Sequence, residues 1–376
     1  MFICPNCGND NPLYFAVRKG NYYCRKCISF LSQEVVYELR EDDEGELYLE
    51  YELTKEQKNI SNKLIEQYKQ GRNSLIHAVC GAGKTEIVYP LIEYVLNQGG
   101  RVGFAIPRKD VVVELYLRIK KAFKNNIVIP LFGGNTKKKE GDIIILTMHQ
   151  IHRYHNYFDL LIADEIDAFP FKDNEILEKF FYRSAKGPIV MMSATPSKRV
   201  LARFKKEDCF KLLRRFHGQD IPVPIIVKKI GMQQELFILS KLKEYIRHNK
   251  PCLIFVPSRE EAEKLSSFLG VFYKNGDFVH SERKNSKKII EMFKNNHFHY
   301  LVTTSILERG ITIKSLQVII YHADNFIFDE VTLEQISGRV GRKKDDPTGD
   351  IIFLCESETN SMHNAIKSIQ KHNENM

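Results

Sequence analysis

The chain has 376 residues, of which 43% are hydrophobic and 27% are charged, and its formal net charge is +9 at pH 7. This composition is typical of globular proteins and excludes a mostly disordered or fibrous chain. No run approaches the ~18 consecutive apolar residues that a membrane span needs, and the first residues have neither the basic nor the apolar segment of a secretory signal. We therefore expect a cytoplasmic protein of about two or three domains.

Four of the eight cysteines form the pattern C-x2-C-x16-C-x2-C near the start of the chain. Each close pair can place two thiolates on one ion, so the pattern predicts a tetrahedral structural zinc site. Two disulfides are the alternative, which a reducing cytosol disfavours. A four-sulfur site has no open position for chemistry, so a catalytic metal is not expected. The predicted ligands are Cys4, Cys7, Cys24 and Cys27.

Charge is distributed unevenly along the chain. Residues 1–50 carry a net charge of −4, including an acidic run at 41–46 that indicates an exposed turn or linker, and the remainder carries +13. Residues 196–230 alone hold ten basic and three acidic side chains. A basic stretch of this kind suits a polyanion such as nucleic acid, although a solvated surface fits the charge about as well.

From residue 54 onward, short apolar runs alternate with amphipathic segments of helical length. Uninterrupted apolar runs are typical of parallel strands that are buried on both faces. The alternation occurs twice, which predicts two consecutive α/β units joined by the basic stretch, with domains at 1–50, 51–205 and 206–376. The predicted strands are 74–80, 101–107, 127–132, 142–147, 158–165, 189–195, 252–257, 299–304, 317–323 and 350–355.

The first predicted strand leads into a glycine-rich loop and then into a helix that begins near Lys84. Glycines allow backbone N–H groups to approach phosphate oxygens, and a helix N-terminus favours negative charge. Lys84 would reach the β- and γ-phosphates of a nucleotide, and the Thr85 hydroxyl would bind magnesium. Ala78 occupies the position of the first glycine of the usual pattern, and a tight turn that happens to contain a lysine is the alternative. The predicted loop residues are Gly81, Ala82 and Gly83.

A second motif is an apolar strand that ends in two carboxylates, Asp164 and Glu165. In an enzyme with a phosphate-binding loop, such a strand presents an aspartate to magnesium, which is the role expected of Asp164. Glu165 would then activate the attacking water as a general base. Either motif alone is weak, but two linked motifs in this order are difficult to obtain by chance.

Three segments extend this pattern, namely Asp-Glu-Ile-Asp at 164–167, Ser-Ala-Thr-Pro at 193–196 and Gln-Ile-Ser-Gly-Arg-Val-Gly-Arg at 335–342. Together they resemble a superfamily 2 helicase, and the resemblance covers residues 53–355. It implies two RecA-like lobes with ATP in the cleft between them. In this family pattern, Gln335, Arg339 and Arg342 complete the ATP site, whereas Ser193 and Thr195 couple hydrolysis to movement. The arginines could also be surface charges on a helix.

Other helicase motifs follow in order. Gln57 falls in a segment that resembles the adenine-reading Q motif, and Thr54-x-x-Gln57 is equally a capping box at a helix start. Glu308 and Gly310 lie in a segment that resembles motif V and would contribute to the nucleotide site. Residues 106–108 resemble helicase motif Ia, residues 303–310 resemble motif V, and residues 147–150 lie where a strand-contacting motif is expected. In the family, these segments contact a nucleic-acid strand. The implied strand contacts are Pro107, Arg108, Thr147, His149, Thr303 and Thr304.

The four cysteines directly ahead of this motor narrow the resemblance. Together with the sequences at 78–86, 164–170 and 307–310, they closely resemble the ComFA family, the late-competence ATPases of Gram-positive bacteria. The resemblance implies ATP, magnesium and zinc as cofactors. It also implies a peripheral motor on the inner face of the cytoplasmic membrane, which helps to draw incoming single-stranded DNA through an uptake channel. The implied partners are the ComEC channel, ComFC and DprA.

Three other functions stay open from the sequence. One is a replication-restart or repair helicase similar to PriA, and another is an RNA helicase, because contacts to the 2′-hydroxyl cannot be predicted from these motifs. A zinc adaptor with an inactive motor is the third, and the intact Lys84, Asp164, Glu165 and Arg342 argue against it.

Overall fold

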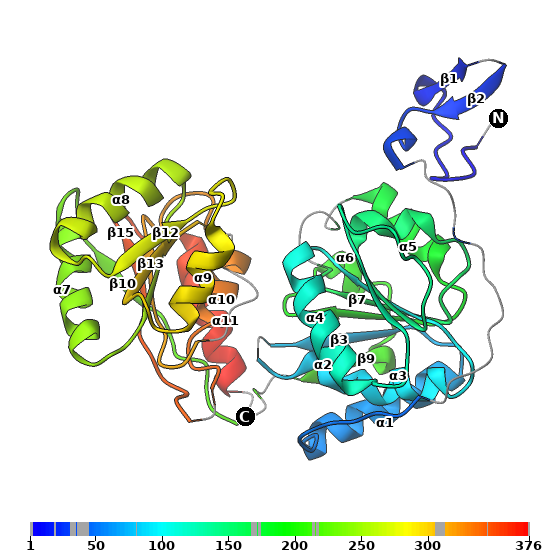
Figure 1. Cartoon of the computed structure of the whole chain (residues 1–376), viewed down its shortest axis with the longest axis horizontal. Helices are drawn as coiled ribbons and strands as arrows, with labels where there is room; N and C mark the ends of the chain where they lie inside the picture. Colours follow the sequence, from blue (N-terminus) through cyan, green and yellow to red (C-terminus); the bar gives the residue numbers. More distant parts are fainter. Residues whose placement is uncertain are drawn as a thin grey trace. The chain divides into compact units, whose positions relative to one another are not determined.

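The computed structural model describes residues 3–18, 20–30, 35, 45–79, 81–166, 171, 174–212, 215, 218–304, 313–343 and 345–374. The chain divides into two compact units, one formed by residues 1–78 and 83–212 and the other by residues 79–82 and 213–376 (Figure 1). Each unit contains its own parallel sheet with flanking helices.

The first unit is built on a seven-stranded sheet in the order β5-β6-β4-β7-β8-β3-β9, in which every pairing is parallel. All side chains of β4, β6, β7 and β8 are buried, which explains their uninterrupted apolar sequences. The strands are β3 (Ser74–Ala78), β4 (Val102–Ile106), β5 (Val128–Leu131), β6 (Ile143–Thr147), β7 (Leu160–Asp164), β8 (Ile189–Ser193) and β9 (Cys209–Leu212).

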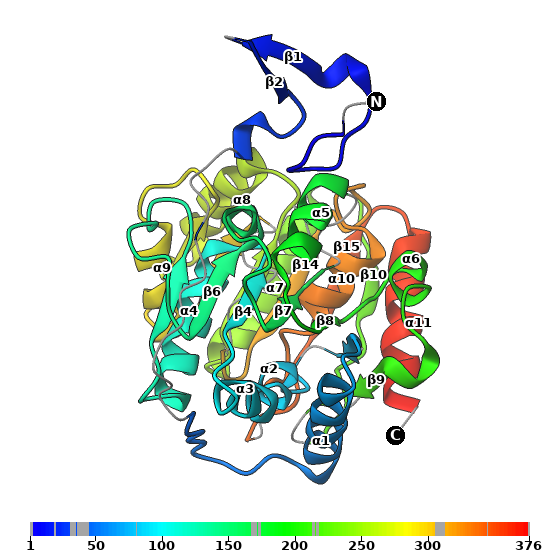
Figure 2. The same ribbon diagram turned by 90° about the vertical axis from the view of Figure 1, so that its right-hand side faces the viewer.

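Helices α1 and α3 of this unit lie side by side (Figure 2), and α4 contacts β4, β5 and β6. The core on one face of the sheet joins strand side chains to α5 and to the 3-10 helix η3. The helices are α1 (Lys55–Lys69), α2 (Lys84–Ile87), α3 (Tyr89–Leu96), α4 (Lys109–Ala122), α5 (Glu175–Ser184) and α6 (Lys198–Leu201), with the 3-10 helices η3 (Met148–Arg153) and η4 (Lys206–Asp208).

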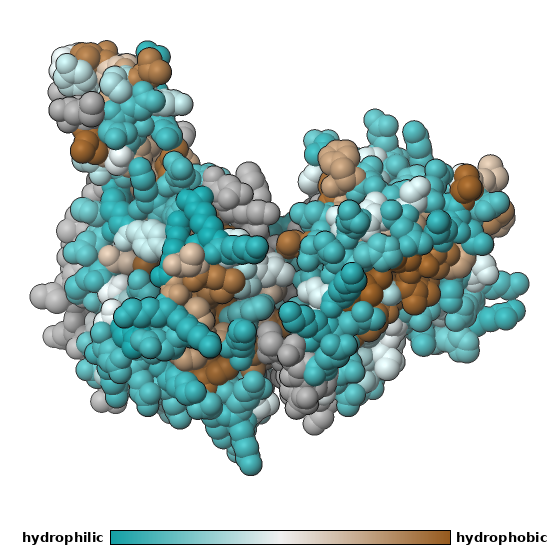
Figure 3. Space-filling model, turned by 180° about the vertical axis from the view of Figure 1, so that it is seen from behind, coloured by the Kyte–Doolittle hydropathy of each residue, from teal (hydrophilic) through white to brown (hydrophobic). Residues whose placement is uncertain are grey.

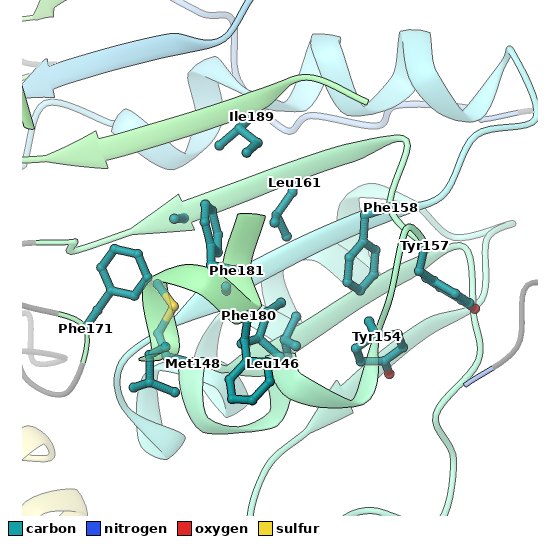
Figure 4. Packing of buried hydrophobic residues seen from close by; sticks show 14 of the residues in the cluster. Leu146, Met148, Tyr154, Tyr157, Phe158, Leu161, Phe171, Phe180, Phe181 and Ile189 are labelled. Atoms are coloured by element: carbon teal, nitrogen blue, oxygen red, sulfur yellow. The ribbon is translucent and has the colours of Figure 1, made fainter. Parts of the chain in front are cut away.

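Aromatic side chains fill this core between the sheet, α5 and the segment after η3 (Figure 4). The Tyr154 ring lies 4.8 Å from that of Phe158 and 5.0 Å from that of Tyr157, measured between centroids. A Cβ at Gly103 on β4 would lie 2.8 Å from carbon atoms of both Phe158 and Leu161, so only glycine allows this close packing. The aromatic cluster therefore fixes η3 and α5 against the sheet.

The second unit contains a six-stranded parallel sheet in the order β10-β15-β14-β11-β13-β12, with a hydrophobic core on each face. The strands are β10 (Ile225–Lys228), β11 (Cys252–Phe255), β12 (Gly276–Val279), β13 (Tyr300–Thr303), β14 (Gln317–Tyr321) and β15 (Ile351–Cys355). The helices are α7 (Gln233–Arg247), α8 (Arg259–Phe272), α9 (Ser286–Lys294), α10 (Glu330–Ser337) and α11 (Asn360–Glu374).

The surface is mostly hydrophilic, with apolar side chains gathered in patches (Figure 3). In the second unit, Ile225, Ile230 and Met232 are among the exposed large apolar side chains, around β10 and the start of α7. Among the described residues, no helix combines the length and the apolar character that crossing a membrane requires.

The N-terminal module contains a two-stranded antiparallel hairpin, β1 (Phe15–Arg18) and β2 (Asn21–Cys24), with the 3-10 helices η1 (Pro12–Tyr14) and η2 (Ile28–Phe30). The pairing places Phe15 opposite Cys24. The hairpin and the turns around it bring the two close cysteine pairs to one place.

The predicted fold class, two RecA-like lobes preceded by a four-cysteine module, is confirmed. All ten predicted strands are present, but β1, β2, β9, β10 and β12 were not predicted. Two of them, β9 and β10, lie in the basic stretch 196–230 that we expected to be only a junction. Because β9 pairs with β3, the first unit includes the chain as far as Leu212. The missed strands have four residues each and lie at sheet edges, where apolar runs are weak.

Candidate functional site

The glycine-rich loop connects the end of β3 to the start of α2. Gly81 and Gly83 have φ angles of +84° and +75°, in the left-handed region that glycine adopts without a steric cost. Gly83 is the N-cap of α2 and has no side chain to bond the first helical N–H groups. These donors at a helix start are what a phosphate group requires. The loop therefore has the backbone of a phosphate cradle.

Gln57 lies directly beside this loop. Its backbone N–H donates to Thr54 Oγ1 at 3.2 Å, and its Oε1 accepts from the Thr54 backbone N–H at 2.9 Å, so the capping box is present at the start of α1. Gln57 is buried, and a Cβ on Gly83 would lie 2.5 Å from its Nε2. Gln57 thus caps α1 and also lies beside the loop, so both interpretations of this segment are compatible.

Lys84 and Asp164 form an ion pair at the mouth of the loop, with 2.5 Å between Nζ and Oδ1. β7 ends at Asp164, whose side chain is buried and also accepts a hydrogen bond from the Glu165 backbone N–H at 2.8 Å. Burial raises the pKa of Asp164 above its ordinary value, and the charge of Lys84 opposes that rise. Thr85 is buried at the next position of α2. Hydroxyl and carboxylate oxygens are ligands that Mg²⁺ prefers, so this set fits the ion.

Glu165 has a φ angle of +56°, a left-handed conformation that is uncommon for a residue with a side chain. Such a conformation costs of order 1–3 kcal/mol and occurs often at active sites. The next backbone N–H, of Ile166, donates to the Met192 carbonyl at 3.5 Å, which ties the turn to β8. Asp164 and Glu165 are consecutive but differ in backbone conformation, which suits two different roles.

The turn after β8 is bonded internally and to a neighbouring strand. Ser193 is fully buried, and its Oγ accepts a hydrogen bond from the Thr195 backbone N–H at 2.9 Å. On β3, the strand that leads into the phosphate loop, the His77 ring Nε2 lies 3.0 Å from the Ala194 carbonyl oxygen. Since β8 lies between β7 and β3 in the sheet, this turn connects the strand of the carboxylates with the strand of the loop.

In the second unit, α10 and the turn after it carry the other predicted ATP-site residues. Gln335 and Arg339 are buried, and the Arg342 Nε donates to the Gly338 carbonyl at 2.9 Å. The predicted Glu308 and Gly310 lie outside the described residues.

Four predicted strand contacts lie together in the first unit. Pro107 and Arg108 follow β4, whereas Thr147 ends β6 and His149 lies on η3. β4 and β6 are neighbours with Ile106 opposite Thr147, so these residues leave the sheet at the same edge. His149 is exposed there, and Pro107 and Thr147 are buried.

The two predicted strand contacts of the second unit lie at the end of β13. Thr303 is fully buried, and its hydroxyl donates to the Thr304 carbonyl at 2.9 Å. Thr304 is half-buried. Of the two side chains, that of Thr304 is therefore the more accessible to a ligand.

The four predicted zinc ligands come together, with all four sulfur atoms within 4.8 Å of one another. The sulfurs of Cys4 and Cys27 are 3.7 Å apart, as are those of Cys7 and Cys24. A disulfide would require about 2.05 Å, so these are free thiols. Zinc–sulfur bonds of about 2.3 Å in a tetrahedron give sulfur–sulfur distances near 3.8 Å. The site therefore fits a structural zinc ion.

The cysteine module packs on η3 and α5 of the first unit, a contact that the sequence did not predict. The Phe30 ring lies 5.5 Å from the His152 ring and 5.4 Å from the Phe180 ring. Arg183 donates to Asn6 Oδ1 at 3.3 Å and to the His152 carbonyl at 2.9 Å. Burial lowers the pKa of His152 to about 4. The module thus contacts the same short helix that carries His149.

Comparisons with known proteins agree with this architecture. A family model described as "Type III restriction enzyme, res subunit" matches residues 50–198, and one described as "Helicase conserved C-terminal domain" matches residues 237–344. Among solved structures, S. cerevisiae Dbp5 bound to RNA and ADP BeF3 aligns with a TM-score of 0.66 at 17% identity, covering 86% of this chain and 88% of that chain. At this identity, the likeness supports the fold alone.

Two curated relatives match almost the whole chain. "Competence protein ComFA" of Bacillus subtilis is 35% identical, covering 99% of this chain and 86% of that protein. "Competence protein ComFA" of Streptococcus pneumoniae is 33% identical, covering 99% of this chain and 90% of that protein. The helicase-family models, the two RecA-like lobes and this identity over 99% of the chain together confirm the predicted resemblance, and the protein belongs to the ComFA family.

Proposed function

We propose that the protein is an ATP-driven motor that moves along single-stranded DNA during DNA uptake. The observation that carries this proposal is the Lys84–Asp164 pair, which joins a phosphate-binding loop to a buried carboxylate at a strand end. The relatives are named competence proteins, which supports DNA uptake as the process. The helicase-family models support a nucleic acid as the track.

The proposed ATP site uses the residues of the first unit in separate roles. Lys84 leaves Asp164 and binds the β- and γ-phosphates, while Asp164 and Thr85 hold magnesium. Magnesium supplies positive charge that offsets the negative charge of the phosphates. Glu165 accepts a proton from the attacking water. Gln57, beside the loop, reads the adenine.

The second unit completes the site in this proposal. Arg339 and Arg342 bind the γ-phosphate when the lobes close, and Gln335 and the motif V residues Glu308 and Gly310 assist them. Hydrolysis removes the group that these arginines bind, so the lobes can separate again. The Ser193–Thr195 turn is bonded to β3, which supports its role in coupling hydrolysis to this movement.

A DNA strand would bind mainly through its backbone. The residues after β4 and β6 offer Arg108 and His149 at one sheet edge, and Thr304 is the accessible contact at β13. Phosphate contacts of this kind predict affinity that falls steeply with salt and varies little with base sequence. Zinc would be structural and would maintain the module against η3.

We also propose that the motor works at the inner face of the cytoplasmic membrane, with the ComEC channel, ComFC and DprA as partners. Family membership supports these assignments. A pull-down of each partner with the full-length protein tests them separately from the enzymatic activity.

The test of the ATP site is a comparison of Lys84→Ala with Lys63→Ala. Lys63 is an exposed lysine of α1, so its loss controls for the change in charge. We expect Lys84→Ala to lose ATP hydrolysis stimulated by single-stranded DNA, and Lys63→Ala to retain it. If Lys84→Ala keeps full activity, the assignment of the phosphate loop is wrong. Efficient unwinding of forked duplexes by the wild type would favour a restart helicase instead.

A further inference from the structure

Arg215 is a buried arginine that belongs to none of the helicase motifs. It lies in the basic stretch 196–230, where we expected side chains that face solvent or a polyanion, yet it is only 3% exposed. Its Nη1 donates to the carbonyl oxygens of Val340 and Gly341, both at 2.7 Å. Its Nη2 donates to the Gly338 carbonyl at 3.3 Å. One guanidinium thus bonds three main-chain carbonyls of a single turn.

One of these carbonyls, that of Gly338, has a particular need for a positively charged donor. Gly338 is the C-cap of α10, and the last carbonyls of a helix have no partner within the helix and carry partial negative charge. The planar guanidinium presents several N–H donors in fixed directions, so it can bond convergent oxygens that a lysine cannot span. Burying a charge is costly, and here the hydrogen bonds to the turn offset that cost.

The turn that Arg215 binds is the one that carries Arg339 and Arg342. The Gly338 carbonyl also accepts from the Arg342 Nε at 2.9 Å, so the two guanidinium groups share one acceptor. Gly341 has a φ angle of +67°, and a Cβ there would lie 2.1 Å from the Pro347 carbonyl oxygen. The hydrogen bonds of Arg215 and the close contact with Pro347 thus both constrain the turn from which the two arginines leave.

We propose that Arg215 is a positioning residue for ATP hydrolysis, which holds the turn at 338–341 in the conformation that Arg339 and Arg342 need at the γ-phosphate. This inference rests on the proposed function, because it assumes that those two arginines act on ATP. Arg215 itself acts through the main chain of the turn. Its loss is expected to impair the chemical step, whereas DNA binding at the strand contacts of the first unit stays intact.

The experiment compares Arg215→Lys with Arg199→Lys in the full-length, zinc-loaded protein. Lysine keeps the charge but offers one point of attachment, and Arg199 is an exposed arginine of α6 that pairs with Glu178. We expect Arg215→Lys to lower the kcat of DNA-stimulated ATP hydrolysis by about tenfold or more, since a displaced arginine finger is worth large factors in rate. The Kd for single-stranded DNA should match that of Arg199→Lys, whereas the thermal midpoint should be somewhat lower, because lysine leaves part of the buried set of carbonyls without a donor.

A double variant separates positioning from a general structural role. If Arg215 acts through Arg339 and Arg342, then adding Arg215→Lys to Arg339→Ala should slow hydrolysis by a smaller factor than Arg215→Lys does alone, because residues that act as a unit are not additive. If the losses in kcat from the two substitutions multiply, the positioning role is overturned. It is also overturned if Arg215→Lys lowers the thermal midpoint and reduces kcat and DNA binding by equal factors.

The remaining outcomes distinguish this inference from the proposed function. Full kcat in Arg215→Lys together with a large loss in Arg339→Ala refutes the inference and leaves the proposed function intact. Full kcat in Arg339→Ala itself would refute the assumption on which both depend.

Discussion

ATP binding has to open the ion pair between Lys84 and Asp164, because the proposed site assigns the lysine to the phosphates and the aspartate to magnesium. In Asp164→Asn, the lysine loses its charged partner, and a carboxylate that repels the nucleotide's phosphates is removed. We therefore expect this variant to bind ATP more tightly than the wild type when magnesium is absent. Adding magnesium should strengthen ATP binding much less in the variant than in the wild type.

The size of the effect follows from the burial and the geometry of the pair. The Lys84 Nζ lies 2.5 Å from Oδ1 of Asp164, which is 7% exposed, so solvent screens the interaction only weakly. A hydrogen bond to a charged group contributes about 1.5–3 kcal/mol. At about 1.4 kcal/mol per factor of ten, releasing the lysine should strengthen magnesium-free ATP binding by about ten- to a hundredfold.

The pH dependence gives a second check on the same pair. Burial raises the pKa of Asp164, so acidification protonates the wild-type carboxyl sooner than an exposed aspartate. Protonation of Asp164 in the wild type removes the same negative charge that Asp164→Asn removes. The difference in ATP affinity between the two proteins should therefore shrink as the pH falls.

The assay is titration of a fluorescent ATP analogue in EDTA and in magnesium, with Glu175→Gln as the control. Glu175 is an exposed carboxylate in the first turn of α5, so its loss changes the net charge equally outside the site. If Asp164→Asn binds the analogue no more tightly than the wild type in EDTA, the reasoning is refuted, because Asp164 would then not restrain Lys84.

Three further predictions concern the loop, the buried histidine and the zinc site. Gly83→Ala should weaken ATP binding, measured by calorimetry, without unfolding the protein. The reason is that φ at this position is +75° and the new Cβ would lie 2.5 Å from Gln57 Nε2. An unchanged affinity for ATP would contradict this geometry. The pKa of His152 is about 4 in the folded state and about 6.5 when unfolded, so the unfolded chain binds more protons between these values. Denaturation in urea should therefore show about 2 kcal/mol less stability at pH 5 than at pH 7, and His152→Gln should reduce that difference. Cys24→Ser should lower the zinc content and increase hydrogen exchange in residues 148–153, whereas unchanged exchange would show that the module does not stabilise η3.

The sequence predicted those parts of the fold and the site that depend on contiguous residues. β6 and β7 are buried on both faces, so their apolar runs identify them. The phosphate loop needs its glycines and Lys84 at fixed spacing, and the carboxylates have to follow a strand directly. By contrast, β9 at the sheet edge alternates buried and more exposed positions over four residues, which gives only a weak pattern.

Contacts between distant parts of the chain could not be predicted in this way. Phe30 packs on His152 and Phe180, and nothing in the local sequence of any of the three indicates the others. Arg215 was predicted as part of a basic surface because its neighbours in sequence are basic, yet its carbonyl partners lie about 125 residues away. A single sequence contains no signal for either contact.

The most direct test of the proposed motor is steady-state ATP hydrolysis by the purified protein, alone and with single-stranded DNA, duplex DNA or single-stranded RNA at equal nucleotide concentration. We predict strong stimulation by single-stranded DNA, weak stimulation by the other two, and loss of the stimulation as salt rises. Equal or greater stimulation by RNA, or stimulation by duplex DNA alone, would contradict a single-stranded DNA translocase.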